Sequence, residues 1–299
     1  MSIKGLKKVL PESAVEFLRR AKLRRGKEKI SSLPALTEDD FKDILVSHLG
    51  LTTGDTVFIH SSVDQLNLAF PYGRMLSLVR EVVGDGGTML FPTYPKLSSY
   101  EFLRRGETFD VRRTPSFMGI LTEFARRQRD AVRSLHPTKS VCAIGRLACE
   151  LTSTHHLSPY PFDSGSPYRR IIEHGGKIVG FGVSTARMSF VHCADDALKD
   201  DFPVRPYHAE LFAAPCINLA GETVTVETFA HDLAKMNPDI PRFVRARLPD
   251  AACRDLNIHG MKFFRADARK VFDEMVRLAR DGITIYPRAA YSKKSERLV

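Results

Sequence analysis

The chain has 299 residues, and its proportions of apolar (43%) and charged (27%) residues are ordinary for a globular protein with a substantial core. No stretch approaches the roughly 18 uninterrupted apolar residues of a membrane-spanning helix. The amino terminus also lacks the apolar run of a secretory signal, so we expect a cytoplasmic protein. The five cysteines are scattered and include no C-x-x-C pair, which predicts free thiols rather than a disulfide framework or a zinc ribbon.

The net charge of +10 is concentrated near the amino terminus. Residues 1–30 hold ten Lys or Arg and three Glu, a net charge of +7, which leaves +3 for the other 269 residues. We therefore divide the chain into a basic arm over residues 1–33, one large domain over 34–285 and a basic tail over 286–299. We interpret the arm as a solvated helix, with a membrane-surface contact or an anion-steering patch as alternatives.

The first predicted element of the domain is a helix that begins at Thr37 and runs toward His48. Thr37 suits the N-cap position, and three acidic residues follow it in the first turn. Three short, almost wholly apolar runs then predict strands covered on both faces: residues 56–60, 88–91 and 177–183. Helical patterns over residues 73–83 and 117–129 follow the first and second of these runs.

The later elements are mostly strands. Residues 141–145 predict a further strand, residues 203–230 are β-rich with a hairpin turn at 219–222, and residues 266–281 predict an amphipathic helix. Alternating strands and helices predict an α/β fold with a mixed, largely parallel central sheet flanked by helices. The carboxyl-terminal portion is expected to be β-rich.

Polar side chains follow each of the three expected central strands. His60, Ser61 and Ser62 follow the first, Thr93 the second and Ser184 the third. Because ligands of open α/β sheets bind beyond the carboxyl ends of the strands, we expect the ligand site at this edge.

The segment that follows residue 183 carries the most specific signal. Ser189 is expected to cap a helix on which His192 and Asp195 are three residues apart, and Asp196 lies one residue further on. Either acid can therefore reach the imidazole, and an imidazole oriented by a carboxylate is a common general base. The alternative is an ordinary helix with a surface His–Asp pair.

Several other chemistries lack their motifs. The sequence has no G-x-S-x-G elbow, which argues against a serine hydrolase, and no G-x-x-x-x-G-K-S/T phosphate loop. His155 and His156 are not at metal-ligand spacing, so no metal is expected.

Seven segments in order resemble the aminoglycoside 3-N-acetyltransferase family. They are V-F-I-H-S-S (57–62), G-G-T-M-L-F-P-T (86–93), T-P-S-F-M-G-I-L-T-E-F-A-R-R (114–127), V-R-S-L-H-P-T-K-S-V-C-A-I-G (132–145), G-S-P-Y-R-R-I (165–171), K-I-V-G-F-G-V (177–183) and S-F-V-H-C-A-D (189–195). The resemblance is strong over about residues 38–200 and weaker over 200–285. It implies an α/β acyltransferase that moves an acetyl or other acyl group directly from acetyl-CoA to a sugar amine.

The resemblance also assigns residues. The family's T-x-L-H-x-A-E motif matches Ser189, His192 and Asp195, which implies that His192 is the catalytic base and Asp195 its partner. The matching segments imply coenzyme contacts at His60, Ser61, Ser62, Thr93 and Ser116. The implied partner is a small amine, either an amino sugar, free or nucleotide-linked, or an aminoglycoside. No nucleic acid is implied, and we expect a monomer or homodimer.

Two other functions remain open from the sequence. Asp195 stands where the family has Glu, so a member that binds coenzyme A without turnover is one alternative. The basic arm supports the other, a nucleic-acid or anionic-membrane binding protein. That second alternative leaves the polar clusters at three strand ends unexplained.

Overall fold

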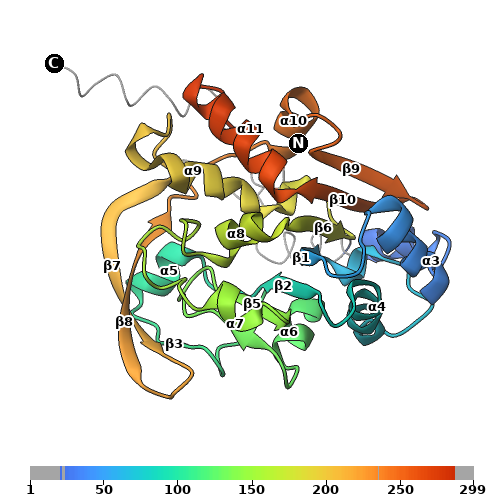
Figure 1. The fold of residues 1–299 in the computed structure, drawn as a ribbon, viewed down its shortest axis with the longest axis horizontal. Coiled ribbons are helices and arrows are strands. Elements are labelled where there is room, and N and C mark those ends of the chain that lie inside the picture. Colours follow the sequence, from blue (N-terminus) through green and yellow to red (C-terminus); the bar gives the residue numbers. More distant parts are fainter. Residues whose placement is uncertain (1–20, 22–23, 235, 287–299) are drawn as a thin grey trace.

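The computed structural model describes residues 21, 24–234 and 236–286 (Figure 1). Most of the expected basic arm, and the expected tail from residue 287 onward, lie outside these residues. Of the described part of the arm, residues 21 and 24–31 are helical, and residues 32 and 33 form a turn. In the described part of the chain no helix is long and apolar enough to span a membrane. All five cysteines are free, as the sequence predicts, and all but Cys149 are buried.

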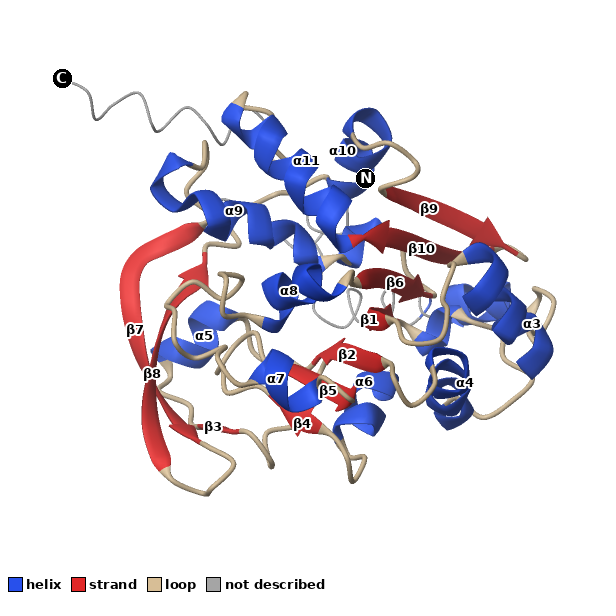
Figure 2. Ribbon diagram, in the orientation of Figure 1, coloured by secondary structure: helices blue, strands red, loops and turns tan. Residues whose placement is uncertain are grey.

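A seven-stranded mixed sheet forms the centre of the fold (Figure 2). Its order is β4-β5-β2-β1-β6-β10-β9. The strands are β1 (Thr56–Ser61), β2 (Thr88–Pro92), β4 (Val132–Arg133), β5 (Val141–Gly145), β6 (Lys177–Phe181), β9 (Cys253–Ile258) and β10 (Met261–Asp267). The three runs expected as central strands are β1, β2 and β6. They are neighbours and run parallel, whereas the outer strands join antiparallel.

Helices cover both faces of this sheet, which confirms the predicted α/β class. Side chains of β1 alternate between the faces: Phe58 belongs to one buried cluster, and Val57 and Ile59 belong to the other. The helices on the Phe58 side are α7 (Ala148–Thr152), α8 (Pro167–Arg170), α9 (His192–Leu198), α10 (Ile240–Arg247) and α11 (Ala268–Arg280). Those on the opposite side are α3 (Glu38–Asp43), which continues as a π-helix over Ile44–His48, α4 (Gly73–Val83) and α6 (Ile120–Arg126).

The predicted start of the first helix is confirmed. The Thr37 hydroxyl accepts a hydrogen bond from the Asp40 N–H at 3.1 Å, and the Asp40 carboxylate accepts one from the Thr37 N–H at 2.9 Å. This reciprocal capping box satisfies two N–H groups that the helix itself leaves without partners.

A second, three-stranded sheet forms the β-rich region. It has the order β3-β7-β8 and consists of β3 (Phe109–Asp110), β7 (Tyr207–Ile217) and β8 (Thr223–His231). The last two form the long, bent hairpin at the left of Figure 1, with its turn at the expected place. Helix α5 (Ser99–Arg104) shares an apolar cluster with this sheet. At the open end of the hairpin, Tyr207 pairs with His231.

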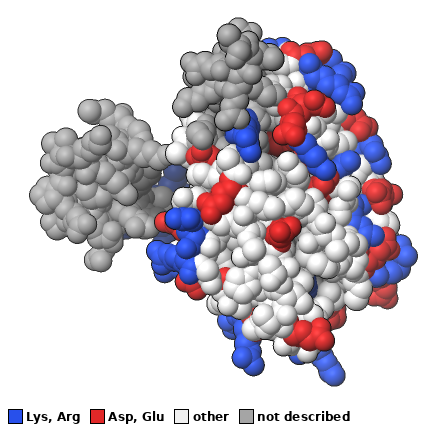
Figure 3. Space-filling view, turned by 90° about the vertical axis from the view of Figure 1, so that its left-hand side faces the viewer, with Lys and Arg blue, Asp and Glu red and all other residues white. Residues whose placement is uncertain are grey.

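Figure 3 shows the left-hand side of the molecule as drawn in Figure 1. This face carries uncharged side chains over most of its centre. Acidic and basic side chains are interspersed, mainly toward its margins. No single sign of charge covers this face.

Candidate active site

A backbone hydrogen bond joins the carboxyl ends of β1 and β6, at the edge of the sheet where the ligand site is expected. The Ser62 N–H donates a hydrogen bond to the Phe181 carbonyl oxygen at 2.9 Å. The backbone then turns through Gly182 at φ +70°, where a Cβ atom would collide with the Ser62 carbonyl oxygen. Strand β6 therefore ends at Phe181, two residues earlier than the apolar pattern predicts, because only glycine fits this close approach.

His60 and Ser61, both expected coenzyme contacts, present polar atoms without partners. His60 is 4% exposed, and its ring stacks on that of Phe58 with centroids 5.2 Å apart. Burial lowers the pKa of His60 to about 3, so the imidazole is neutral. Within the described residues, neither His60 Nε2 nor Ser61 Oγ has a hydrogen-bond partner. Ser62 differs, because its hydroxyl donates to Asp64 Oδ1 at 2.5 Å.

Thr93 and Ser116 use their hydroxyls inside the protein. Thr93 is fully buried, and its hydroxyl donates to the Ser140 carbonyl oxygen at 3.2 Å. The Ser116 hydroxyl lies 2.9 Å from that of Thr122 and is also buried. The guanidinium of the buried Arg133 spans this region and contacts both Thr93 and the Thr114 carbonyl oxygen. Both hydroxyls therefore form hydrogen bonds within the protein, and neither is hydrogen-bonded to His192 in the described part of the chain.

His192 opens helix α9, but the helix begins differently from the sequence expectation. Ser189 is not an N-cap: it starts a 3₁₀ turn over Ser189–Val191 that leads into α9, and its hydroxyl makes no capping hydrogen bond. The expectation was wrong because the turn places Met188, in an extended conformation, at the cap position. The helical spacing beyond His192 is nevertheless as expected.

Asp195, and not Asp196, pairs with His192. His192 Nδ1 and Asp195 Oδ2 are 2.9 Å apart, the His192 side chain is 13% exposed, and that of Asp195 is fully buried. Asp196 is turned away from the imidazole and accepts hydrogen bonds from the Phe162 N–H and the Tyr207 hydroxyl, both at 2.7 Å. Burial raises the pKa of Asp196 well above its usual range, although these two bonds favour the charged form.

Tyr286 contacts both members of the His192–Asp195 pair, and the sequence analysis did not predict this contact. Its hydroxyl donates to Asp195 Oδ2 at 2.6 Å and lies 3.2 Å from His192 Nδ1. Tyr286 stands at the boundary of the expected tail, yet it is only 3% exposed. No local pattern marks it, since 91 residues separate it from Asp195.

Aromatic rings surround the His192 imidazole. The rings of Phe162 and His231 lie with centroids 5.3 and 4.8 Å from it. His231, which the sequence reading missed, stacks in turn on Tyr207 at 4.5 Å. Burial lowers the pKa of His231 well below its usual value, and the nearby His192 and Lys139 lower it further. His231 Nε2 has no hydrogen-bond partner among the described residues.

Ser189 lies beside a pair of tyrosines. Its side chain interacts with the Tyr94 hydroxyl, which also lies 2.5 Å from the Tyr168 hydroxyl. Burial raises the pKa of Tyr94 to about 12, so this cluster stays neutral. Tyr94 follows β2 and Tyr168 lies on α8, so the cluster joins the ligand edge of the sheet to the start of α9.

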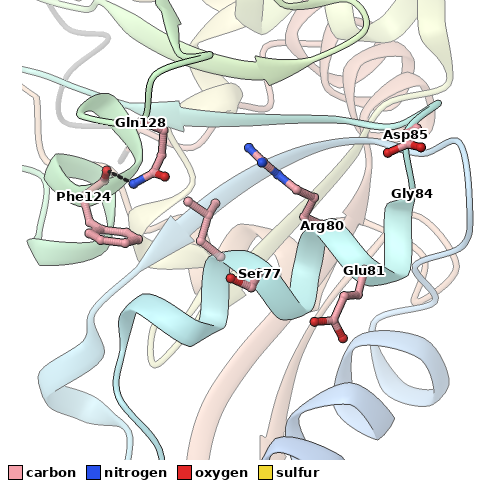
Figure 4. Close-up of a pocket in the computed structure, with 8 residues that line it drawn as sticks. Ser77, Arg80, Glu81, Gly84, Asp85, Phe124 and Gln128 are labelled. Carbon is pink, nitrogen blue, oxygen red and sulfur yellow. Dashed lines mark hydrogen bonds between the residues drawn. The ribbon is translucent and has the colours of Figure 1, made fainter.

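An open groove of the described surface lies away from these residues (Figure 4). It has a volume of about 500 Å³ and runs along α4, with Phe124 and Gln128 on its other wall. Arg80 projects into it, and its charge is balanced by Asp130 at 2.8 Å. None of the expected site residues lines it. No group of three or more His, Cys, Asp or Glu within residues 21, 24–234 and 236–286 is arranged to hold a metal ion.

Comparison with known proteins agrees with the sequence resemblance. A family model described as aminoglycoside 3-N-acetyltransferase matches residues 58–280. The aminoglycoside N(3)-acetyltransferase III of Serratia marcescens is 31% identical over 161 residues, which are 49% of this chain and 60% of that protein. The type VII enzyme of Streptomyces paromomycinus is 31% identical over 167 residues, which are 51% of this chain and 57% of that protein. The matched region thus spans less than two thirds of these relatives.

Solved structures show the same fold. The crystal structure of AAC(3)-Xa superposes with a TM-score of 0.68 at 22% identity and covers 89% of this chain and 99% of that one. AAC-IIIb, described as a binary complex with CoASH, gives a TM-score of 0.67 at 21% identity and covers 85% of this chain and 100% of that one. The family model covers most of this chain, including most of β1, the His192–Asp195 pair and α11. The chain belongs to the aminoglycoside 3-N-acetyltransferase family.

Proposed function

We propose that this protein is an N-acetyltransferase that moves the acetyl group of acetyl-CoA to the amine of an amino sugar or aminoglycoside, with His192 as general base. The observation that carries the proposal is the partly exposed His192 imidazole held 2.9 Å from the buried Asp195 carboxylate. Membership of the family supports the reaction type. The curated relatives are acetyltransferases by name, and one structural neighbour is described with CoASH.

Asp195 and Tyr286 prepare the imidazole for this role. Asp195 Oδ2 faces His192 Nδ1, which favours the tautomer that carries its proton on Nδ1 and leaves the lone pair of Nε2 for an incoming amine. The carboxylate also stabilises the imidazolium that forms when Nε2 takes up a proton. The second hydrogen bond, from Tyr286, holds the carboxylate in place.

In the proposed reaction the amine nitrogen attacks the carbonyl carbon of the thioester. His192 Nε2 takes the proton that the nitrogen loses as the carbon–nitrogen bond forms. The carbon–sulfur bond then breaks, and His192 returns the proton to the sulfur, which leaves as a thiol. The products are an amide and free coenzyme A, and no covalent enzyme intermediate is needed.

Polar atoms at the ligand edge fit a thioester substrate. His60 Nε2 and Ser61 Oγ are buried without partners, and buried polar groups are normally hydrogen-bonded. A pantetheine amide or the thioester carbonyl would supply the missing partners. Thr93 and Ser116, also expected as coenzyme contacts, would support the wall of this site because their hydroxyls are engaged internally. Five free cysteines are consistent with a cytoplasmic location, which we also propose.

The test is the replacement of His192. Thiol release from acetyl-CoA is measured with a panel of amines, and coenzyme binding is measured separately by calorimetry. His192→Ala should lower kcat by about 100-fold or more, the usual contribution of a general base, and leave the coenzyme dissociation constant unchanged. His48→Ala, at a partly exposed site on the opposite face of the sheet, serves as the control. Near-normal turnover by His192→Ala would overturn the assignment.

A further inference from the structure

Lys139 is a charged side chain that the proposed reaction does not use. It lies in the segment between β4 and β5, and its ammonium group sits over the Tyr94 ring, 4.7 Å from the centroid. The side chain is half-buried. In the described part of the chain its ammonium group makes this ring contact but no ion pair and no hydrogen bond.

Lys139 belongs to the surroundings of the His192–Asp195 pair. Its backbone carbonyl oxygen accepts a hydrogen bond from the Tyr168 hydroxyl, and Tyr168 in turn contacts Tyr94. Its charge also acts on His231, whose ring lies 4.8 Å from that of His192. Lys139 therefore lies near Tyr94, which contacts Ser189, and its charge acts on His231, which packs beside His192.

A cation in this position destabilises the unliganded protein. Burial lowers the pKa of Lys139 to about 8, so the folded protein loses part of the charge near neutral pH. The contact with Tyr94 offsets only part of the desolvation. Half-buried charges without a counter-ion are concentrated at functional sites, where a ligand supplies the opposite charge.

Three carboxyl groups near the base already have partners inside the protein. Asp195 binds His192 and Tyr286, Asp196 binds Tyr207 and the Phe162 N–H, and Asp163 accepts from Ser158 and pairs with Lys199 at 3.1 Å. Of these three carboxylates, only Asp195 keeps a buried oxygen, Oδ1, without a hydrogen-bond partner among the described residues. Little of their charge is therefore left for a polycationic acceptor.

A second cation lies close to the start of α9. The Arg169 guanidinium stacks on Phe272 at 3.6 Å, and no described acidic residue pairs with it. Its charge is felt at the Cys193 thiol, next to His192. Lys139 and Arg169 are therefore two cations near the start of α9 that no described carboxylate pairs with.

We propose that Lys139 binds a phosphate or carboxylate group on the acceptor, so that the acceptor is an amino sugar that carries a negative charge. This inference rests on the proposed acetyl transfer and names its substrate class. An ammonium group beside an aromatic ring binds an anion without fixed geometry, which suits either a sugar phosphate or a sugar acid. The amine of the same sugar would then be presented to His192 Nε2.

The first experiment compares acceptors with the full-length protein. Thiol release from acetyl-CoA is measured with glucosamine, glucosamine 1-phosphate, glucosamine 6-phosphate, UDP-glucosamine, glucosaminuronic acid and kanamycin. At least one anionic amine should have a kcat/KM about tenfold or more above that of glucosamine, and kanamycin should be a poorer substrate than that amine. A preference for kanamycin, or equal values for neutral and anionic sugars, overturns the inference. If no amine releases thiol, the proposed acetyl transfer itself fails.

The second experiment replaces the lysine. Lys139→Gln should raise KM for the best anionic acceptor about tenfold or more, and leave both KM for acetyl-CoA and kcat/KM for glucosamine within about twofold. Lys96→Gln is the matched control, since Lys96 also lies over an aromatic ring, that of Phe117, at 5.9 Å. A rise in KM for acetyl-CoA with unchanged KM for the acceptor would instead assign Lys139 to the coenzyme.

The pH dependence gives a readout that a purely structural lysine would not affect. The groups that face Lys139 are Tyr94, Tyr168, His136 and His231, and burial keeps all four neutral around pH 8. KM for the anionic acceptor, relative to that for glucosamine, should therefore rise above about pH 8, where Lys139 loses its proton. Lys139→Gln should abolish this rise. A ratio that is flat from pH 7 to 9 in the unmodified protein contradicts the proposal.

Discussion

The Tyr286 hydroxyl donates a hydrogen bond to Asp195 Oδ2 at 2.6 Å across 91 residues of sequence. The same carboxylate oxygen faces His192 Nδ1 at 2.9 Å, so one buried oxygen receives two donors. Helix α11 and the residues that follow it bring Tyr286 to this position, and α11 packs beside α9 (Figure 1). The carboxyl-terminal region therefore helps to orient the candidate base.

Replacing Tyr286 by Phe should slow turnover without weakening coenzyme binding. The ring still packs against Phe202, but Asp195 loses a donor. Loss of a hydrogen bond to a charged group predicts a kcat about tenfold lower. The acid-side limb of the kcat profile should move to higher pH, because the carboxylate with one donor fewer attracts the imidazolium proton more strongly. Unchanged kcat together with an unmoved limb would show that Tyr286 is only a packing residue.

The two neighbouring aspartates should respond differently to the same substitution. Asp195→Asn removes the charge that stabilises the imidazolium, so kcat should fall by about 100-fold or more. Asp196→Asn replaces a carboxyl whose raised pKa already favours the neutral form, and an amide oxygen can still accept from Tyr207. Its kcat should stay within about threefold of the original. Steady-state thiol release on both variants checks the contrast, and equal losses would contradict it.

Gly182→Ala should destabilise the ligand edge more than an equally strained glycine elsewhere. Gly106 has a similar φ of +64° but open space around its Cα, so Gly106→Ala should cost only the left-handed penalty of about 1–2 kcal/mol. Gly182→Ala adds a collision with the Ser62 carbonyl oxygen and should lower the free energy of unfolding further. Urea denaturation of both variants measures the difference, and equal losses would show that the backbone of this loop can move aside.

Buried neutral histidines should make the protein sensitive to acid. Burial lowers the pKa of His60 and His155 to about 3, and lowers those of His136 and His231 well below the usual value. The unfolded chain binds protons at these residues below about pH 6.5, whereas the folded protein does not, so stability is present above pH 6.5 and is lost as pH falls.

Each such histidine contributes up to about 1.4 kcal/mol of lost stability per pH unit in that range. Urea denaturation between pH 7 and 5 measures the slope, and His155→Gln should reduce it. A free energy of unfolding that does not change over this range would contradict the burial of these groups.

Local patterns in the sequence predicted much of this protein. The Thr37 capping box, the three apolar runs that form β1, β2 and β6, and the hairpin turn depend on neighbouring residues, and all are confirmed. The expected His192 pair also follows from local geometry, since residues three and four apart share one face of a helix. The cap at Ser189 was wrong, because a 3₁₀ turn precedes α9.

The sequence alone determined that His192 has two possible carboxylate partners, and that the family motifs surround it in order. Only the tertiary structure chose between Asp195 and Asp196, because the choice depends on Tyr207, Phe162 and Tyr286, which other elements bring into contact. The same holds for Lys139 and His231. Their positions beside the base result from the packing of distant strands and loops, and no periodicity along the chain encodes such contacts.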